Sequence, residues 1–222
     1  MKTKELIKPL IIVLTTALFF IVSVVSAFLL FEKDETDVTE VGFVKVSAEI
    51  FLDDILYEEI DAGSDIDVIE INLSDRNDDL FFEKLSIDII VLSNVDTYLR
   101  VAIYEQFTLT YITGGVVNKI AVTKDEYAPF VFNNSFYNNR IEDDYFYYVN
   151  KVQRINENEG LRIPFIYKHP ENEYVLHDSK YTIQLAIKVE AVQAVGGPLY
   201  NWGLTNPPWA NKAGYENEDT IW

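Results

Sequence analysis

The pattern of apolar and polar residues divides the chain into two parts. Residues 9–31 contain no charged side chain, and a helix of that length reaches about 35 Å, enough to cross a hydrocarbon core of roughly 30 Å. Beyond residue 41, apolar and polar residues alternate in short runs, as in strands with one buried face. The sequence therefore predicts a membrane-targeting helix followed by a β-rich body.

Strand-like alternation recurs through that body. The predicted strands cover residues 44–52, 66–73, 80–92, 97–112, 116–122, 145–152, 160–167 and 181–194. Gly114-Gly115 offers a two-residue hairpin turn, and Pro164 indicates a strand that lies at a sheet edge or carries a bulge. We interpret Asp53–Asp65 as an acidic connector that contains a short turn of helix at 55–60.

About eight to nine strands separated by turns are typical of two packed antiparallel sheets, so the predicted fold class is an all-β sandwich. The predicted domains are an N-terminal helix over 1–31, an acidic linker over 32–41, a β-sandwich over 42–195 and an irregular aromatic tail over 196–222. We expect the first half of the tail, to about Trp209, to pack against the sandwich.

Charges around the apolar stretch predict its orientation. Lys2, Lys4 and Lys8 precede it, whereas acidic residues dominate after it, so the amino terminus is expected in the cytoplasm and the body outside. Two alternatives stay open for the leader. It is either a single-pass membrane anchor through residues 9–31, or a signal peptide cleaved after Ala27, which would release the protein to the cell surface or the medium.

The net charge excludes one class of partner. Because three Lys and one Glu fall in residues 1–31, the other 191 residues carry a net charge of −20, against −18 for the whole chain. A body this acidic repels phosphate backbones and anionic lipid head groups, which argues against nucleic-acid binding and against a body that lies on the membrane. The chain has no cysteine, so the sandwich must be stable without disulfides.

Three strand segments carry a more specific pattern: Thr97–Ile103 (TYLRVAI), Asp144–Tyr148 (DYFYY) and Val189–Ala194 (VEAVQA), with Trp202-Gly203 behind the last. Their order and spacing across residues 42–203 resemble the TasA and camelysin-type exported proteins of Firmicutes, which depend on a dedicated signal peptidase. The resemblance implies a jelly-roll-like sandwich in a cell-surface or biofilm-matrix protein. Some members of that group polymerise by lending an N-terminal strand to a neighbour.

No motif in the sequence points to an enzyme. There is no G-x-S-x-G elbow, and the two histidines, His169 and His177, lack the thiols or the H-E-x-x-H spacing of a zinc site. Carboxylate pairs carry no information among 36 acidic residues. We therefore predict no catalytic residue, and calcium is the one cofactor that the composition leaves open.

Calcium prefers six to eight oxygen ligands from flexible loops, and three acidic clusters offer them. The candidate ligands are Asp61, Asp65 and Asp67 in the first cluster, Asp75, Asn77, Asp78 and Asp79 in the second, and Glu142, Asp143 and Asp144 in the third. None has the EF-hand spacing. The alternative is a solvated acidic surface without a bound ion.

Aromatic residues gather in the tail, where Trp202, Trp209 and Tyr215 could form a flat platform for sugar rings or a partner protein. The alternative is that the tryptophans cover the sandwich as part of its core. Within the strands, Arg100 is expected to pair with a carboxylate, either Glu105 or Glu190.

The leading functional prediction is a non-enzymatic extracytoplasmic surface protein with a structural, adhesive or matrix-assembly role. Its expected partners are the membrane, other copies of itself in an oligomer or filament, or a surface polysaccharide or protein. The alternative is a carbohydrate- or calcium-binding β-sandwich module at the cell surface.

Overall fold

The computed structural model describes residues 42–61, 68–123, 128, 130–153, 160–174, 180–216 and 222. They all fall in one compact unit, Gly42–Trp222. The predicted leader at 9–31, its cleavage position after Ala27 and the linker 32–41 lie outside the described residues. Within the described ranges, no helix has the length and apolar character needed to cross a membrane.

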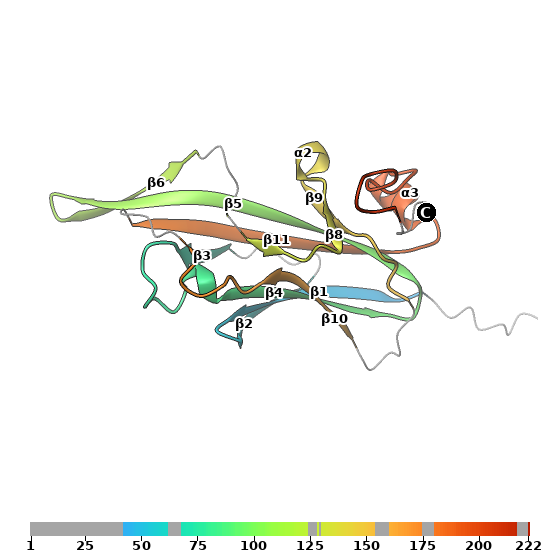
Figure 1. The fold of residues 1–222 in the computed structure, drawn as a ribbon, viewed down its shortest axis with the longest axis horizontal. Helices are drawn as coiled ribbons and strands as arrows, with labels where there is room; N and C mark the ends of the chain where they lie inside the picture. Colours follow the sequence, from blue (N-terminus) through green and yellow to red (C-terminus); the bar gives the residue numbers. More distant parts are fainter. Residues whose placement is uncertain are drawn as a thin grey trace, which may run out of the picture. The chain divides into compact units, whose positions relative to one another are not determined.

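Strands dominate this unit, and its helices are short (Figure 1). The strands are β1 (Val44–Leu52), β2 (Ile55–Asp61), β3 (Val68–Asn72), β4 (Leu85–Ser93), β5 (Thr97–Thr113), β6 (Val116–Val122), β7 (Val131–Phe132), β8 (Phe136–Asn138), β9 (Tyr145–Tyr148), β10 (Leu161–Tyr167) and β11 (Tyr181–Gln193). The helices are the 3-10 turn η1 (Phe82–Lys84), α2 (Arg140–Asp143) and α3 (Gly197–Trp202).

Two antiparallel sheets form the sandwich. One sheet has the order β2-β1-β4-β10-β7, and the other has the order β3-β11-β5-β9-β8 with β6 also paired to β5. The two sheets lie one above the other in Figure 1. The predicted all-β sandwich is thus confirmed. The last strand in the sequence, β11, lies inside its sheet because it pairs with β5 along 13 residues and with β3 on its other edge.

Alternation along the strands builds the core between the sheets. Ile50, Ile87, Val101 and Leu185 come from four different strands and are fully buried in one apolar cluster. Phe165 of β10 packs across the sandwich against Phe146 of β9 in the other sheet, at a ring-centroid distance of 5.3 Å. Burying each such side chain contributes about 1.5–3 kcal/mol, so this cluster provides the main driving force for pairing the two sheets.

The structure corrects one predicted connector. Residues 55–61 form β2, which pairs with β1, instead of a connector with a turn of helix. Most of its side chains are exposed and only Ile60 is buried, so the segment lacks the alternation by which a half-buried strand is recognised. The very short strands β7 and β8 were not predicted either, because two or three residues carry no period.

Other strand predictions are confirmed. Residues 97–113 and 116–122 form the expected hairpin, and the pairing of β10 with β4 shifts register between Pro164 and Ile166, which is the expected bulge. The bulge leaves β10 inside its sheet, between β4 and β7. In the tail, the residues after Gly196 begin with the short helix α3 instead of an irregular segment.

An ion pair lies inside the second sheet at the root of the hairpin. Arg140 Nη1 donates to Glu105 Oε1 at 3.0 Å, and the two side chains are only 6% and 4% exposed. Glu105 Oε2 accepts a 2.7 Å hydrogen bond from the backbone N–H of Ala128. The guanidinium lies over the ring of Phe146 at 4.6 Å. Burial raises the pKa of Glu105, although the Ala128 N–H and Arg140 act in the opposite direction.

A second buried carboxylate, Glu83 in η1, fixes the loop that precedes β11. It accepts backbone hydrogen bonds from Asn172 at 3.1 Å and Tyr174 at 2.9 Å, and Arg76 lies 3.5 Å away. Burial acts to raise the pKa of Glu83, but the two N–H donors and Arg76 outweigh it, so its pKa lies below the ordinary value of 4.5.

We expect Glu83→Gln to lower the free energy of unfolding at pH 7 by about 1–2 kcal/mol, the range for hydrogen bonds to a charged group. Since the folded-state pKa of Glu83 is depressed, its contribution is present above pH 4.5 and is lost as the pH falls through the folded-state pKa. The variant and the wild type should therefore converge in acid. Urea unfolding at pH 7 and pH 3 measures this, with the exposed Glu173→Gln as control. An equal gap at both pH values would contradict it.

Candidate functional site

The most distinctive opening in the sandwich lies along β11. On one edge β11 pairs with β5 from Tyr181 to Gln193, but on the other edge β3 pairs only with residues 182–186. Among the described residues, no strand pairs with that second edge beyond Ala186. Within the described ranges, β11 therefore has no strand partner on this edge beyond Ala186, and an edge of this kind is a template for another chain.

The direction of the backbone groups on this edge follows from the end of β11. Tyr181 faces β3, because its carbonyl accepts from the Leu73 N–H at 3.0 Å and its N–H donates to Ser74 Oγ at 3.0 Å. The pairing of β11 with β5 has no register shift. Strand alternation then places the N–H and C=O of Val189 and Ala191 on the same side as those of Tyr181, toward the open edge.

A groove of about 530 Å³ lies beside this edge. Its lining comes from β1, the end of β2, β11 and α3, with apolar residues Val44, Val46, Val189, Ala191, Val192 and Trp202 and polar residues Lys45, Asp61, Lys188, Glu190 and Asn201. Lys45 and Asp61 form an ion pair of 3.1 Å at the rim. An apolar wall beside unpaired backbone groups suits an extended peptide, whose main chain bonds to the edge while alternate side chains enter the groove.

Arg100 fixes the outer side of β11 next to the groove. Its guanidinium bonds to Glu190 Oε2 at 2.6 and 2.8 Å, which confirms one of the two expected partners, and it stacks on the Tyr145 ring at 3.8 Å. Lys188 also contacts Glu190, at 2.6 Å. Burial acts to raise the pKa of Glu190, but Lys188 and Arg100 hold it below its usual range. These interactions fix the Glu190 side chain on the strand that borders the groove.

The tail aromatics cover the outer face of the same sheet. Trp209 is buried at 1% exposed and packs with Tyr147 and Val149 of the β9 region. Trp202 lies over Arg100 at 4.7 Å, and Tyr215 meets Tyr137 edge-on at 5.3 Å. The structure thus brings the three predicted platform residues into one cluster. Of these, Trp202 also lines the groove.

The environment of the aromatic cluster changes the pKa of one tyrosine, Tyr147. Tyr147 donates its hydroxyl to Asp143 Oδ2 at 2.6 Å and accepts from Arg100 at 3.3 Å. Burial, followed by the hydrogen bond to Asp143, raises the pKa of Tyr147 far above its usual range. The phenol therefore stays neutral, and the pair acts as a packing contact. Asp143 belongs to the third predicted calcium cluster, so one of its oxygens already has a partner.

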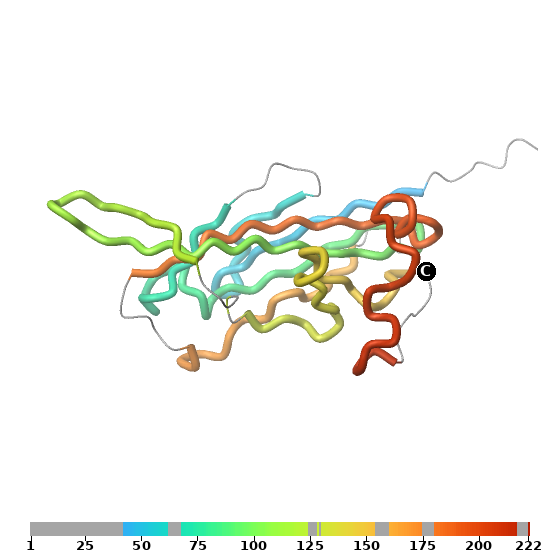
Figure 2. Tube along the Cα trace, turned by 90° about the horizontal axis from the view of Figure 1, so that it is seen from above, coloured from blue at the N-terminus to red at the C-terminus, as the bar shows by residue number. Residues whose placement is uncertain are grey.

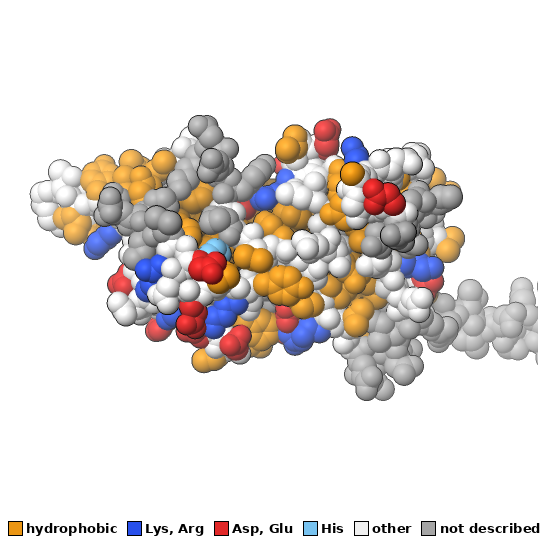
Figure 3. All heavy atoms as spheres, viewed as in Figure 1, with side chains coloured by type: hydrophobic (Ala, Val, Ile, Leu, Met, Phe, Trp, Pro, Cys, Tyr) orange, Lys and Arg blue, Asp and Glu red, His pale blue; other side chains and the backbone are white. Residues whose placement is uncertain are grey.

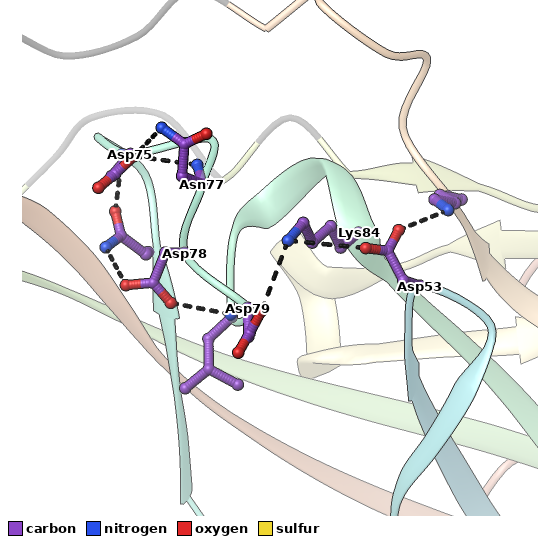
Figure 4. Close-up of polar contacts among 9 residues, drawn as sticks. Asp53, Asp75, Asn77, Asp78, Asp79 and Lys84 are labelled. Atoms are coloured by element: carbon purple, nitrogen blue, oxygen red, sulfur yellow. Dashed lines mark hydrogen bonds and ion pairs between the residues drawn. The ribbon is translucent and has the colours of Figure 1, made fainter.

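The first two predicted calcium clusters lie in different parts of the fold. Asp61 borders the groove, while Asp65 and Asp67 lie outside the described residues. In the loop after β3, Asp75 Oδ1 accepts from Asn77 N at 2.9 Å and Asp79 points toward Lys84 at 4.0 Å (Figure 4). No group of three or more His, Cys, Asp or Glu able to hold a metal ion occurs in the described part of the chain. The calcium site stays a prediction.

The ring of His169 packs against two aromatic side chains. Its ring lies 5.5 Å from the Phe82 ring and 6.1 Å from the Tyr174 ring. The second histidine, His177, lies outside the described residues.

The groove itself was not predicted from the sequence. It is formed by residues of β1, β2, β11 and α3, which are far apart in the sequence and come together only in the folded sandwich.

Comparisons with known protein families, with curated proteins and with solved structures found no match to this chain. The geometry of the groove is therefore the basis for the functional proposal.

Proposed function

We propose that this chain is a non-enzymatic extracytoplasmic surface protein with a structural role, and that its sandwich assembles with other copies by accepting an extended strand along the open edge of β11. The observation that carries this proposal is the edge of β11 at Val189 and Ala191, which pairs with no strand of the described residues and borders a groove of about 530 Å³. Main-chain hydrogen bonds would supply affinity, and the groove would select the side chains.

The location outside the cytoplasm rests on the sequence. The apolar stretch 9–31 with Lys2, Lys4 and Lys8 before it predicts export of the acidic body. The finer expectations, a jelly-roll arrangement of the strands and a place in a biofilm matrix, rest on the resemblance to TasA and camelysin-type proteins. An assembled surface protein unites these expectations with the open edge.

A carbohydrate ligand is the second candidate for the same groove. It is favoured by Trp202 and Asn201, which line one end of the groove and could stack on and bond to a sugar ring. The groove also borders the backbone groups of β11, which have strand spacing and which an extended peptide matches better than a sugar. Fluorescence of the tryptophans during titration with surface polysaccharide separates the candidates, since a saturable change would support the sugar.

Ala191→Pro is expected to impair assembly. Proline removes the N–H that Ala191 directs to the open edge but breaks no hydrogen bond to β5, because the β5-facing groups belong to the even-numbered residues of β11. A lost hydrogen bond and the steric block should raise the concentration for half-assembly about tenfold or more. Sedimentation velocity of the full chain in mild detergent over a concentration series measures the effect.

Ala191→Ser is the matched control, because it keeps the N–H with nearly the same side-chain volume. It should assemble like the wild type. The proposed function fails if the wild type stays monomeric at every concentration, or if the proline variant assembles as readily as the serine variant.

A further inference from the structure

The hairpin of β5 and β6 extends beyond the rest of its sheet. β11 begins at Tyr181, opposite Leu109, so the β5 residues from Tyr111 to Thr113 pair only with β6. Figure 2 shows the hairpin past the ends of the other strands. Among the described residues, β6 pairs with β5 alone. Its outer edge therefore has no strand partner within them, and it belongs to a different part of the sheet from the groove beside β11.

The direction of the backbone groups on the outer edge of β6 follows from the pairing of β5. The N–H of Thr110 donates to the carbonyl of Lys180, next to β11, so the odd-numbered residues of β5 direct their backbone groups toward β6. Their partners in β6 are even-numbered. By alternation, Val117, Lys119 and Ala121 direct their N–H and C=O groups to the outer edge.

The connection that follows β6 starts and finishes at the root of the hairpin. The chain leaves β6 at Val122 and is back beside Glu105 at Ala128, whose N–H bonds to that carboxylate at 2.7 Å. A path from Val122 to Val117 and back measures about 34 Å, whereas six residues span roughly 20 Å. This connection is therefore too short to pair with the edge at Val117.

The projecting part of the hairpin is apolar on both faces. Ile112 and Val117 are cross-strand partners that are 63% and 61% exposed, and Val116 and Ile120 are 62% and 46% exposed on the other face. Figure 3 shows hydrophobic side chains gathered over this hairpin. Apolar clusters of this kind on a surface mark interaction sites. An unpaired edge between two apolar faces fits a second strand, which bonds to the backbone and covers the side chains together.

A lipid bilayer is a poor occupant of this surface. The N–H and C=O groups on the outer edge of β6 would enter the hydrocarbon without partners, and open sheet edges do not occur there for this reason. A second strand edge satisfies these groups and also removes the apolar side chains from water.

The charge of the hairpin favours a second copy of the same hairpin. Residues 107–122 contain no carboxylate and one cation, Lys119, which pairs with Glu70 of its own copy at 2.6 Å. Residues 32–222 together carry −20. Two such acidic bodies repel each other over most of their surfaces, whereas two neutral hairpins can meet with little repulsion.

The sequence of β6 is complementary to itself about Asn118. Antiparallel pairing of Asn118 with the partner's Asn118 places Val116 opposite the partner's Ile120, and this apolar pair forms twice. Val117 then lies opposite the partner's Lys119, whose aliphatic stem can cover it. A register centred on Lys119 would instead place two like charges opposite each other, which is destabilising.

We propose that two copies of the chain form a dimer by pairing the outer edges of their β6 strands, antiparallel and centred on Asn118. This inference goes beyond the proposed strand-accepting function and uses neither the groove nor β11. The same patch serves on both copies, so the contact is isologous and closes at two. It covers residues 116–120 of each strand, about 16 Å, less than a standard interface, so we expect a reversible dimer with a Kd in the micromolar range.

Disulfide cross-linking tests this register, because the chain has no cysteine of its own. Residues opposite each other in a non-hydrogen-bonded antiparallel pair lie about 4.5 Å apart at Cα, within the range of disulfides. The full-length Asn118→Cys chain in mild detergent should therefore give a linked dimer under mild oxidation, seen on non-reducing electrophoresis. Val116→Cys and Ile120→Cys should each stay unlinked alone and should link when they are mixed.

A proline on the outer edge tests the backbone hydrogen bonds. Val117→Pro removes an outward N–H and breaks no hydrogen bond to β5. In the Ala191→Pro chain, where the groove contact is weakened, it should raise the Kd of the dimer about tenfold or more by sedimentation velocity. Val117→Thr keeps the N–H and the branched shape, so this matched control should leave the Kd unchanged. Both variants should keep the wild-type circular dichroism spectrum.

The outcomes separate this inference from the proposed function. Equal linking by Asn118→Cys and Val116→Cys, or an unchanged Kd in Val117→Pro, would overturn the hairpin dimer and leave the strand-accepting function standing. Binding of the wild type to neutral phosphatidylcholine vesicles that Ile112→Lys weakens, with no linking by Asn118→Cys, would assign the hairpin to lipid and overturn the dimer. Linking by Asn118→Cys in the Ala191→Pro chain would support the dimer whatever the fate of the groove.

Discussion

Replacing Glu105 by Leu is expected to lower the free energy of unfolding by about 3–5 kcal/mol, since it leaves the guanidinium of Arg140 buried without its carboxylate. The two side chains are 4% and 6% exposed, so water cannot take the place of the missing partner. The substitution also removes the acceptor of the Ala128 N–H. Urea unfolding at pH 7, followed by circular dichroism, measures the loss.

The double variant Glu105→Leu with Arg140→Met is the control for this prediction. Replacing both members of a buried ion pair by apolar residues of similar size is often neutral or stabilising. We therefore expect the double variant to recover more than half of the loss. Additive losses in the double variant would show that the two side chains do not depend on each other.

The single variant Arg140→Met should gain a pH dependence of defined sign. Burial already raises the pKa of Glu105, and removing Arg140 removes an opposing influence. A group with a raised folded-state pKa stabilises the fold below its unfolded pKa, and that contribution is lost as the pH rises through the folded-state value. The variant should therefore lose stability relative to the wild type as the pH rises above 4.5, the ordinary value for a glutamate side chain.

The second large effect is expected at Trp209. Trp209→Ala should cost about 3–5 kcal/mol, the range for removing a buried aromatic side chain, because the indole is 1% exposed and fills the space beside Tyr147 and Val149. The tail residues that cover the outer face of the sheet should become more mobile as a consequence. Urea unfolding measures the free energy, and limited proteolysis reports new cleavage within residues 203–216.

Tyr200→Ala is the matched control for Trp209, since Tyr200 belongs to the same tail but is 85% exposed. It should change the free energy of unfolding by less than about 0.5 kcal/mol. If the two variants lost similar free energies of unfolding, the stabilisation would come from the tail as a whole and would not depend on the buried indole of Trp209.

Local sequence pattern predicted the parts of the fold that alternate. The hairpin around Gly114-Gly115, the bulge at Pro164 and the sandwich itself follow from period and turn chemistry. Strand β2 was not predicted because most of its side chains are exposed on both faces, so its sequence lacks the alternation of apolar and polar residues that marks a half-buried strand. Its strand character comes from pairing with β1, which is a property of two segments together.

The site depends on contacts between distant residues, and these were only partly predictable. Because the chain is rich in acidic residues, a carboxylate partner for Arg100 could be predicted, and this partner is Glu190. The partner of Glu105 is Arg140, 35 residues further along the chain, and no pattern joins them. The groove beside β11 is lined by residues of β1, β2, β11 and α3, and only the folded sandwich brings these segments together.

The position of β11 also bears on the order of events during synthesis. β11 is the last described strand in the sequence, yet it lies between β3 and β5 in the second sheet. That sheet therefore cannot be completed until residue 193 is available. Strand pairings between such distant segments form slowly, because the entropy of closing a long loop is lost before the contacts between the strands form. The second sheet of such a chain is completed only after its carboxyl-terminal part is available, which would agree with the export that we propose.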